Sequence, residues 1–253
     1  MKPYPINLNL KNRKVLIAGA GRVAARKFRG LLETEAEVMI VSPTYNNFFV
    51  RYLPGDFNPG DSFQKIIATL ICTFKNRKFK KTDLKEKFLV IAATDNSAVN
   101  EKIAVQAKAK NILVNVVDQP ELSDFNLPAS TAKGDLLLTV STGASLPALS
   151  KAVKEELAQN YGIEYQLLLQ VMMELRPEII AQIADRSLRK EIFKSLASAE
   201  FLRGLKNLLL RATEAGEQKP EGDIISADSD LYLEVKNRVI KLVKSYKGDF
   251  SED

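Results

Sequence analysis

A short glycine motif between a strand and a helix constrains the fold of this chain more than any other feature. The motif, GAGRVA at residues 19–24, follows the apolar run Val15–Ala18, which predicts a buried strand. It opens the segment Arg22–Glu33, whose apolar residues are spaced as in a helix. In such a turn the first glycine allows a tight bend, the second lets backbone approach a pyrophosphate, and the alanine lets helix and strand pack closely. The motif therefore predicts a dinucleotide-binding Rossmann-type domain, although a glycine-rich turn without a ligand has the same local pattern.

The pyrophosphate of such a ligand is expected at the N-terminus of the helix, where free N–H groups and the helix dipole favour anions. The cofactor-binding residues predicted in this turn are Gly19, Gly21, Arg22 and Val23.

Short apolar strands alternate with amphipathic stretches through the first half of the chain. The further strands predicted from this pattern are Val38–Val41, Leu70–Phe74, Phe88–Ala93 and Leu113–Val117, with a helix over Asn96–Lys110. Alternation of this kind is typical of an α/β fold, with a parallel sheet and helices on both faces.

After residue 118 the pattern changes, and from Pro147 onwards nearly every segment is predicted to be helical. A strand at Leu136–Ser141 precedes this region. The predicted helices are Ala148–Asn160, Glu164–Leu175, Leu188–Ala215 with a break, and Leu231–Tyr246. Pro177 interrupts this helical pattern. We therefore expect boundaries near residues 113 and 147.

Two residue counts restrict the chemistry. The chain has no histidine and a single cysteine, Cys72, which excludes Ser-His-Asp and Cys-His catalysis, histidine metal sites and thiolate cages. Proton transfer must then involve carboxylates, lysine, tyrosine or a cofactor. No apolar run is long enough to span a bilayer and the N-terminus has no secretory pattern, so we expect a cytoplasmic protein with no membrane partner.

The charge balance favours an anionic partner. Basic residues number 37 and acidic residues 31, which gives a net charge of +6. The basic run Lys75–Lys87 could be a nucleic-acid patch, but it carries no recognised nucleic-acid motif. The preferred interpretation is a solvated connection between a strand and a helix, and no nucleic-acid partner is predicted.

Two strand ends add candidates for the cofactor site. About twenty residues past the glycines, where NAD-binding folds carry an acid for the ribose, this chain has Ser42 followed by Pro43. The Ser42 hydroxyl could bond the ribose, but neither an acid nor a base stands there, so the choice between NAD and NADP is left open. Thr94 and Asp95 follow a buried strand and are expected to contact the cofactor. Asp95 and Asn96 could also form the N-cap of the next helix, which would explain Asp95 equally well.

Four segments in order resemble the family of precorrin-2 dehydrogenases and sirohydrochlorin ferrochelatases. They are YPINLNLKNRKVLIAGAGRVAARK, VIAATDNSAVN, VNVVDQPELSDFNLPA and GDLLLTVSTGASLPAL. This family includes the N-terminal half of bacterial sirohaem synthase and a fungal dehydrogenase-ferrochelatase. The resemblance covers residues 3–157, and the helices after Tyr161 are similar only in being helical.

The resemblance implies NAD-dependent oxidation of the tetrapyrrole precorrin-2 to sirohydrochlorin, to which some members add the insertion of ferrous iron. It also implies a homodimer with three parts: an NAD-binding Rossmann domain over residues 1–113, a dimerisation and substrate-cleft region over 114–147, and a C-terminal helical domain over 148–253. Asp118 matches the family's key carboxylate, which accepts a proton or orients a pyrrole N–H. The alternative role for Asp118 is to cap a turn before Pro120. The positions that match the walls of the substrate cleft are Asn115, Phe125, Ser141 and Thr142.

Other functions remain compatible with the residues. The chain could be a non-catalytic NAD- or tetrapyrrole-binding protein, or a different NAD-dependent oxidoreductase on the same frame. Iron insertion is also open, because the macrocycle itself supplies four nitrogen ligands and Asp118 could take the pyrrole protons. No metal site of the protein is predicted.

Overall fold

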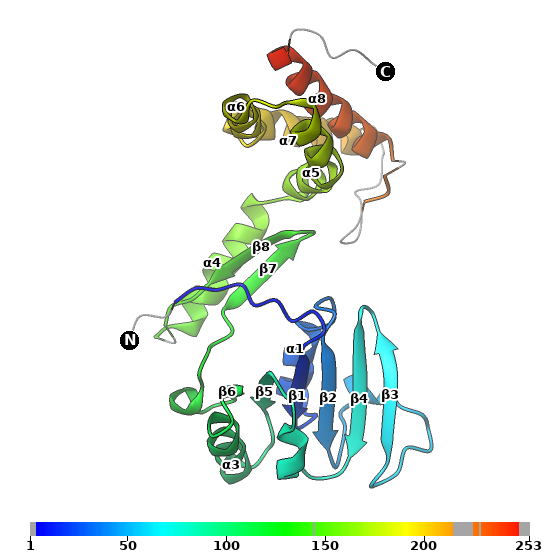
Figure 1. Ribbon diagram of the computed structural model, residues 1–253, viewed down its shortest axis with the longest axis vertical. Helices are drawn as coiled ribbons and strands as arrows, with labels where there is room; N and C mark the ends of the chain where they lie inside the picture. Colours follow the sequence, from blue (N-terminus) through cyan, green and yellow to red (C-terminus); the bar gives the residue numbers. More distant parts are fainter. Residues whose placement is uncertain (1–3, 144, 215–224, 228, 248–253) are drawn as a thin grey trace. The chain divides into compact units, whose positions relative to one another are not determined.

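The structure is a computed structural model that describes residues 4–143, 145–214, 225–227 and 229–247. The chain divides into two compact units, Met1–Leu127 and Pro128–Asp253, which are described separately below (Figure 1).

The first unit is built on a six-stranded sheet in the order β3-β4-β2-β1-β5-β6 (Figure 1). Its strands are β1 (Lys14–Ala18), β2 (Glu37–Ser42), β3 (Ser62–Ile67), β4 (Leu70–Asn76), β5 (Leu89–Ala92) and β6 (Leu113–Val116). Every pairing is parallel except that of the edge strand β3 with β4. The predicted α/β class and parallel sheet are therefore confirmed.

Helices cover both faces of this sheet because alternate strand residues point to opposite sides. Val15 and Ile17 of β1 share a core with Phe28 of α1 (Arg22–Arg29), whereas Leu16 and Ala18 pack in a second core beneath α3 (Ser97–Lys108). The shorter helical segments of this unit are α2 (Asn47–Val50), η1 (Lys81–Leu84) and η2 (Pro120–Leu122). Burial on both faces explains why the strands read as continuous apolar runs.

The details differ from the prediction at two places in the first unit. Helix α1 ends at Arg29, not at Glu33, because Gly30 follows it and Leu31 N–H bonds back to the Phe28 carbonyl in a tighter turn. Strand β3 was not predicted, because only its last residue, Ile67, is buried. Pairing with β4 forms this edge strand, and an exposed edge needs no apolar alternation.

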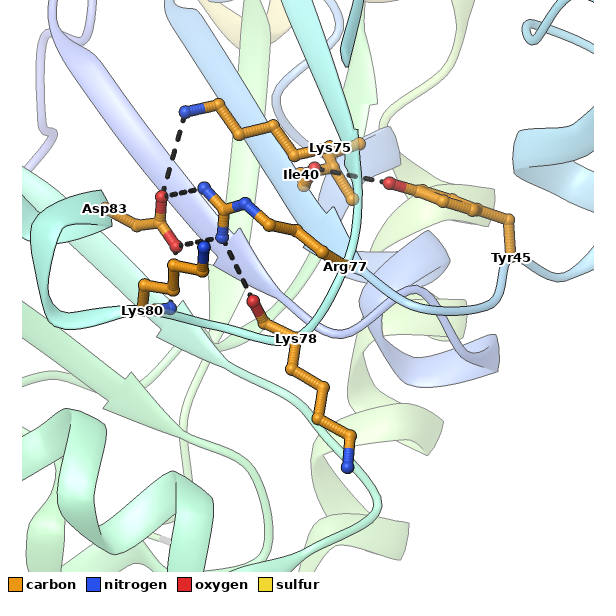
Figure 2. Close-up of polar contacts among 7 residues, drawn as sticks. All are labelled: Ile40, Tyr45, Lys75, Arg77, Lys78, Lys80 and Asp83. Carbon is orange, nitrogen blue, oxygen red and sulfur yellow. Dashed lines mark hydrogen bonds and ion pairs between the residues drawn. The ribbon is translucent and has the colours of Figure 1, made fainter. Parts of the chain in front are cut away.

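The basic run Lys75–Lys87 is more than a solvated connection. Asp83 lies within it and is only 3% exposed. Arg77 donates two hydrogen bonds to the Asp83 carboxylate, from Nη1 to Oδ2 at 2.8 Å and from Nη2 to Oδ1 at 2.6 Å (Figure 2). The backbone N–H of Lys80 donates to Oδ2 at 2.8 Å, and Lys75 Nζ lies 3.7 Å from Oδ1 (Figure 2). This cluster ties the end of β4 to η1.

Removal of the Asp83 charge is expected to destabilise the first unit. Burial alone would raise the pKa of Asp83, but the hydrogen bonds and charges of Arg77, the Lys80 N–H and the Lys75 charge outweigh it and lower the pKa. A lowered pKa contributes stability above about pH 4, the ordinary value, and that stability is lost as the pH falls through the folded-state value. We expect Asp83→Asn to lower the free energy of unfolding by about 3 kcal/mol at neutral pH.

Urea unfolding at pH 7 and at acidic pH checks this prediction. Glu86→Gln, in the exposed Lys14–Glu86 pair, is the matched control and should change little. An Asp83→Asn protein as stable as the control would contradict a stabilising role for the cluster.

The second unit begins with a hairpin of β7 (Ala129–Lys133) and β8 (Leu136–Val140), followed by helices. The helices are α4 (Pro147–Asn160), α5 (Ile163–Gln182), α6 (Arg186–Leu196), α7 (Ala199–Glu214) and α8 (Asp230–Lys247). Helices α5 to α8 share one apolar core. The predicted break falls between α6 and α7, and the predicted helix end at Ala215 lies outside the described residues.

Helix α5 continues through Pro177, so the predicted end at Leu175 is wrong. Proline lacks the N–H that would bond the carbonyl of Met173, one turn earlier. Met173 is 67% exposed, on the side of the helix away from the core, where a carbonyl without a helical partner costs least. Burial of Val171, Leu175 and Ile179 on the opposite side holds the helix together.

The observed division differs from the boundary expected near residue 113. Strand β6 is part of the six-stranded sheet, and the following segment bonds to its free edge. Asp124 N–H donates to the Val114 carbonyl at 2.8 Å, and Val114 N–H donates to the Asp124 carboxylate at 3.0 Å. Ser123 Oγ accepts from Val116 N–H at 2.8 Å. These bonds keep residues up to Leu127 with the first unit.

Candidate functional site

The predicted phosphate-binding turn leads from β1 to α1 and lies against the end of β5. Gly19 has a φ of +103° and donates its N–H to the Val41 carbonyl at 2.9 Å. A Cβ on Gly19 would lie 2.2 Å from the Ala93 carbonyl oxygen, which no side chain can do. Only glycine fits this position, and it brings the turn directly against the loop after β5.

Gly21, unlike Gly19, faces open space. It is the N-cap of α1, no side chain caps the helix there, and a Cβ on Gly21 would meet no atom within 4 Å. The N–H groups of the first turn of a helix have no partners within it, so they point into this open space. The first turn of α1 has no acidic residue, and Arg22 is exposed beside it. Open space, free N–H groups and an adjacent cation are the features that a dinucleotide pyrophosphate requires.

The side chain of Ser42 is engaged within its own turn. Ser42 is 5% exposed, donates to the Thr44 carbonyl at 2.5 Å and accepts from Thr44 N–H at 3.4 Å. Pro43 is exposed in this turn, and Asn46 N–H donates to the Ala20 carbonyl at 3.1 Å. The loop after β2 is thus fixed to the glycine turn, and a ribose bond from Ser42 requires its hydroxyl to exchange partners.

Thr94 organises the loop after β5. Its hydroxyl donates to Asn100 Oδ1 at 2.7 Å, and its N–H bonds the same oxygen at 3.1 Å. Asn96, not Asp95, caps α3, by accepting from Val99 N–H at 3.1 Å. Asp95 is exposed at the carboxyl end of β5. The capping alternative for Asp95 is therefore wrong, and the Thr94 hydroxyl already has a structural partner.

Asp118 is held in an unusual backbone conformation at the end of β6. Its φ is +62°, in the left-handed region that few non-glycine residues adopt. The preceding residue, Val117, donates its N–H to the Ala92 carbonyl at 2.9 Å, which fixes the turn next to the end of β5. Asp118 is exposed, and within the described residues its carboxylate has no hydrogen bond or ion pair. The turn-capping alternative lacks the bond it requires.

Of the two cleft residues predicted in the first unit, Asn115 lies in β6 and Phe125 lies in the segment that follows it. Asn115 is 5% exposed and donates from Nδ2 to the Phe125 carbonyl at 2.9 Å. Phe125 is half-buried and packs against the core on the α1 side. Asn115 thereby positions the segment after Asp118, and its predicted contact with substrate stays a prediction.

The other two cleft residues lie in the second unit, between β8 and α4. Ser141 is exposed and accepts from Gly143 N–H at 3.3 Å. Thr142 Oγ1 accepts from Leu146 N–H at 3.4 Å and lies 2.9 Å from Ser150 Oγ. The loop is therefore anchored on α4, and the Ser141 hydroxyl stays at the surface.

Other groups that could transfer protons are less suitable than Asp118. Burial raises the pKa of Tyr45, whose hydroxyl donates to the Ile40 carbonyl at 3.4 Å (Figure 2). Burial also raises the pKa of the Cys72 thiol, so both groups stay protonated at neutral pH. Among the residues that the structure describes, no three acidic or cysteine side chains gather as metal ligands. In the same part of the chain, no helix combines the length and apolar character needed to cross a membrane.

Comparison with known proteins places this site in context. A family model described as "Putative NAD(P)-binding" matches residues 6–129, which include the glycine turn and Asp118. The sirohaem synthase of Psychromonas ingrahamii is 30% identical over 231 residues, covering 88% of this chain and 46% of the relative. The precorrin-2 dehydrogenase of Priestia megaterium is 27% identical over 198 residues, covering 78% of this chain and 91% of the relative. The chain is similar in sequence to members of the precorrin-2 dehydrogenase family over most of its length.

The fold is also similar to that of a solved structure. The solved structure of SirC, a precorrin-2 dehydrogenase, superimposes with a TM-score of 0.63 at 23% identity and covers 96% of this chain and 100% of that one. The chain spans about half the length of the sirohaem synthases it matches, 46% in the example given. With a match to an NAD(P)-binding family model and a glycine turn that fits a pyrophosphate, the first unit has a binding site for a nicotinamide dinucleotide.

The fold brings part of the predicted site together. Gly19, Thr94 and Asp118 follow β1, β5 and β6, whose carboxyl ends are neighbours in the sheet. Two supporting residues were missed, namely Asn100, which is 4% exposed, and Ser150, which is 8% exposed. The signal for Asn100 was available, because a polar residue occupies the apolar face of its helix.

Proposed function

We propose that this chain oxidises precorrin-2 to sirohydrochlorin, with NAD as the hydride acceptor. The observation that carries the proposal is the unpaired carboxylate of Asp118, held at φ +62° at the end of β6. Strand β5 separates β6 from β1 and its cofactor turn. A carboxylate without a protein partner at the carboxyl end of a parallel strand is available to a ligand in the crevice there. The two relatives, a sirohaem synthase and a precorrin-2 dehydrogenase, support the same reaction.

The reaction removes one hydride and one proton from the tetrapyrrole. When bound, the nicotinamide ring accepts the hydride. The first-turn N–H groups after Gly21 and the Arg22 side chain would hold the pyrophosphate, and the loop of Thr94 and Asp95 would support the riboside next to it. A carboxylate oxygen of Asp118 accepts the proton that the substrate loses, or orients a pyrrole N–H. Asn115, Phe125, Ser141 and Thr142 are proposed to contact the macrocycle.

NAD is proposed in preference to NADP. Ser42 and Pro43 end β2, where a 2′-phosphate would need a cation. Two basic residues at the end of the adjacent strand β4, Lys75 and Arg77, are already paired with Asp83 (Figure 2).

A second candidate activity is insertion of ferrous iron into sirohydrochlorin. The exposed, unpaired Asp118 carboxylate could take up pyrrole protons while the four nitrogens of the macrocycle bind the metal. Iron would then be a substrate, and the protein would need no metal ligands of its own.

We propose a homodimer because the hairpin and α4 do not bury their own apolar side chains. Within β7 and β8, even the residues on the better-covered face are only half-buried, and α4 has Ser150 as its single fully buried residue. Leu137 and Leu149 are 53% and 47% exposed. A two-stranded sheet of this kind is marginal by itself, so a second copy of the chain is its proposed cover.

We expect charges at the proposed interface to dissociate the dimer. Leu137→Asp and Leu149→Asp would each desolvate a carboxylate if the surface is buried between copies, and should weaken dimerisation at least about tenfold. Sedimentation of the purified proteins measures this. Leu210→Asp is the control, since Leu210 of α7 is similarly exposed, at 52%. A wild-type monomer, or an unchanged dimer in both variants, would contradict the proposed interface.

The decisive experiment is anaerobic incubation with enzymatically generated precorrin-2 and NAD, in which NADH absorbance is followed. Appearance of NADH together with sirohydrochlorin supports the dehydrogenase. Binding of NAD or sirohydrochlorin without turnover would instead favour a non-catalytic binding protein, and NADH formation with other substrates alone would favour a different oxidoreductase. Sirohydrochlorin with ferrous ions, without NAD, tests iron insertion separately.

A further inference from the structure

Buried polar oxygens without partners mark the segment around Asp118. In the described part of the chain, four buried side-chain oxygens have no hydrogen-bond partner: Asn76 Oδ1, Gln106 Oε1, Asn115 Oδ1 and Gln119 Oε1. Two of these four lie within five residues, on either side of Asp118. An unsatisfied buried acceptor costs free energy and calls for an explanation, such as a missing ligand.

Gln119 makes no local hydrogen bond that would account for its buried amide oxygen. It occupies the N-cap position of η2, yet its side chain makes no capping hydrogen bond. Asn115 differs, because its Nδ2 holds the Phe125 carbonyl at 2.9 Å and the residue is 5% exposed. Gln119 as a whole is half-buried and adjoins the exposed Asp118, so its amide lies close to the surface at this strand end.

The position of Gln119 on the sheet indicates which part of a ligand it would meet. In a doubly wound sheet the dinucleotide spans the crevice where strand order reverses, with one mononucleotide half on each side. Here the glycine turn follows β1, and β2 and β5 flank it. The adenosine ribose belongs over the end of β2, so the nicotinamide half lies over β5 and β6. A hydrogen bond from Val117 N–H to the Ala92 carbonyl links those two strand ends, two residues before Gln119.

We propose that Gln119 binds the carboxamide of the nicotinamide ring, its side-chain oxygen accepting a hydrogen bond from the carboxamide NH₂. This inference rests on the proposed function and deepens it, because it assigns a positioning residue for the ring that accepts the hydride. The Gln119 amide offers both an acceptor and a donor, so it can bond the NH₂ and the oxygen of a carboxamide together, whereas a carboxylate could bond only to the Gln119 NH₂. Gln119 thereby selects the ligand and sets the orientation of the ring relative to Asp118.

Calorimetric binding of NAD and of ADP-ribose, which lacks the nicotinamide, tests the assignment without turnover. We expect Gln119→Leu to weaken NAD binding about tenfold and to leave ADP-ribose binding unchanged. Wild-type protein should bind nicotinic acid adenine dinucleotide more weakly than NAD, and Gln119→Leu should reduce that difference. Gln64→Leu, on the exposed edge strand β3, is the matched control and should bind all three ligands like wild type.

The outcomes separate this inference from the proposed function. Equal weakening of NAD and ADP-ribose by Gln119→Leu, or no effect on either, would overturn the role of Gln119 and leave the proposed function standing. A wild-type protein that binds ADP-ribose and NAD with equal affinity would also overturn it, because the carboxamide would then contribute nothing. Failure of the wild-type protein to bind any of the three would overturn the proposed function as well.

Discussion

Replacing Asp118 by asparagine should lower the turnover of precorrin-2 by about 10²–10⁴-fold, the contribution typical of a positioned proton acceptor. Asparagine keeps the size of the side chain and tolerates the left-handed backbone, so the φ of +62° is preserved and only the carboxylate is lost. The affinity for NAD should be unchanged, since the pyrophosphate turn is a different segment. Anaerobic measurement of NADH formation, with calorimetry for NAD, checks both parts.

Two further variants separate chemistry from backbone strain. Asp118→Gly also removes the carboxylate but relaxes the strained φ, so it should be as inactive as Asp118→Asn and at least as stable. Glu121→Gln removes an exposed carboxylate in η2, three residues further on, and should leave turnover unchanged. Wild-type turnover in Asp118→Asn would exclude Asp118 from the mechanism. Equal losses in Asp118→Asn and Glu121→Gln would mean that general electrostatics, not a specific proton acceptor, is responsible.

The sheet could be predicted because its information is local. Apolar runs such as Val15–Ala18 and Phe88–Ala93 are buried on both faces, and this burial is visible in composition alone. Their order along the chain then implies a parallel sheet, and the end of each strand becomes a candidate site residue. Thr94 was predicted in this way, and Asp118, which was predicted from the family resemblance, lies at the neighbouring strand end.

Features that depend on contacts between distant residues could not be predicted. The burial of Asp83 depends on Arg77, six residues earlier, folding back over it, and nothing in a run of lysines signals that pair. The hydroxyls of Thr94 and Thr142 were assigned to ligands, but Asn100 and Ser150 contact them once the helices pack. The left-handed backbone of Asp118 is set by the turn after β6, which the residue type alone does not specify.

The two glycines of the cofactor turn should respond to substitution in opposite ways. Gly21→Val should fold normally, because its backbone is extended, at φ −77° and ψ −171°, and its Cβ would meet no atom within 4 Å. The added side chain would occupy the space in front of the helix N-terminus, so NAD should bind at least roughly 100-fold more weakly, a loss of about 2.7 kcal/mol. Calorimetric titration with NAD, with thermal unfolding in its absence, measures both effects.

Gly19→Ala is the opposite case and completes the test. A Cβ there would lie 2.2 Å from the Ala93 oxygen and 2.6 Å from its carbon, on a backbone with φ +103°. The overlap and the strained φ together should lower the free energy of unfolding by about 2–5 kcal/mol, because β1 and β5 must move apart. If Gly21→Val kept its affinity for NAD while Gly19→Ala lost it through unfolding alone, the turn would be a structural link between two strands. Loss of NAD affinity in a fully folded Gly21→Val protein is the result that requires a dinucleotide at the N-terminus of α1.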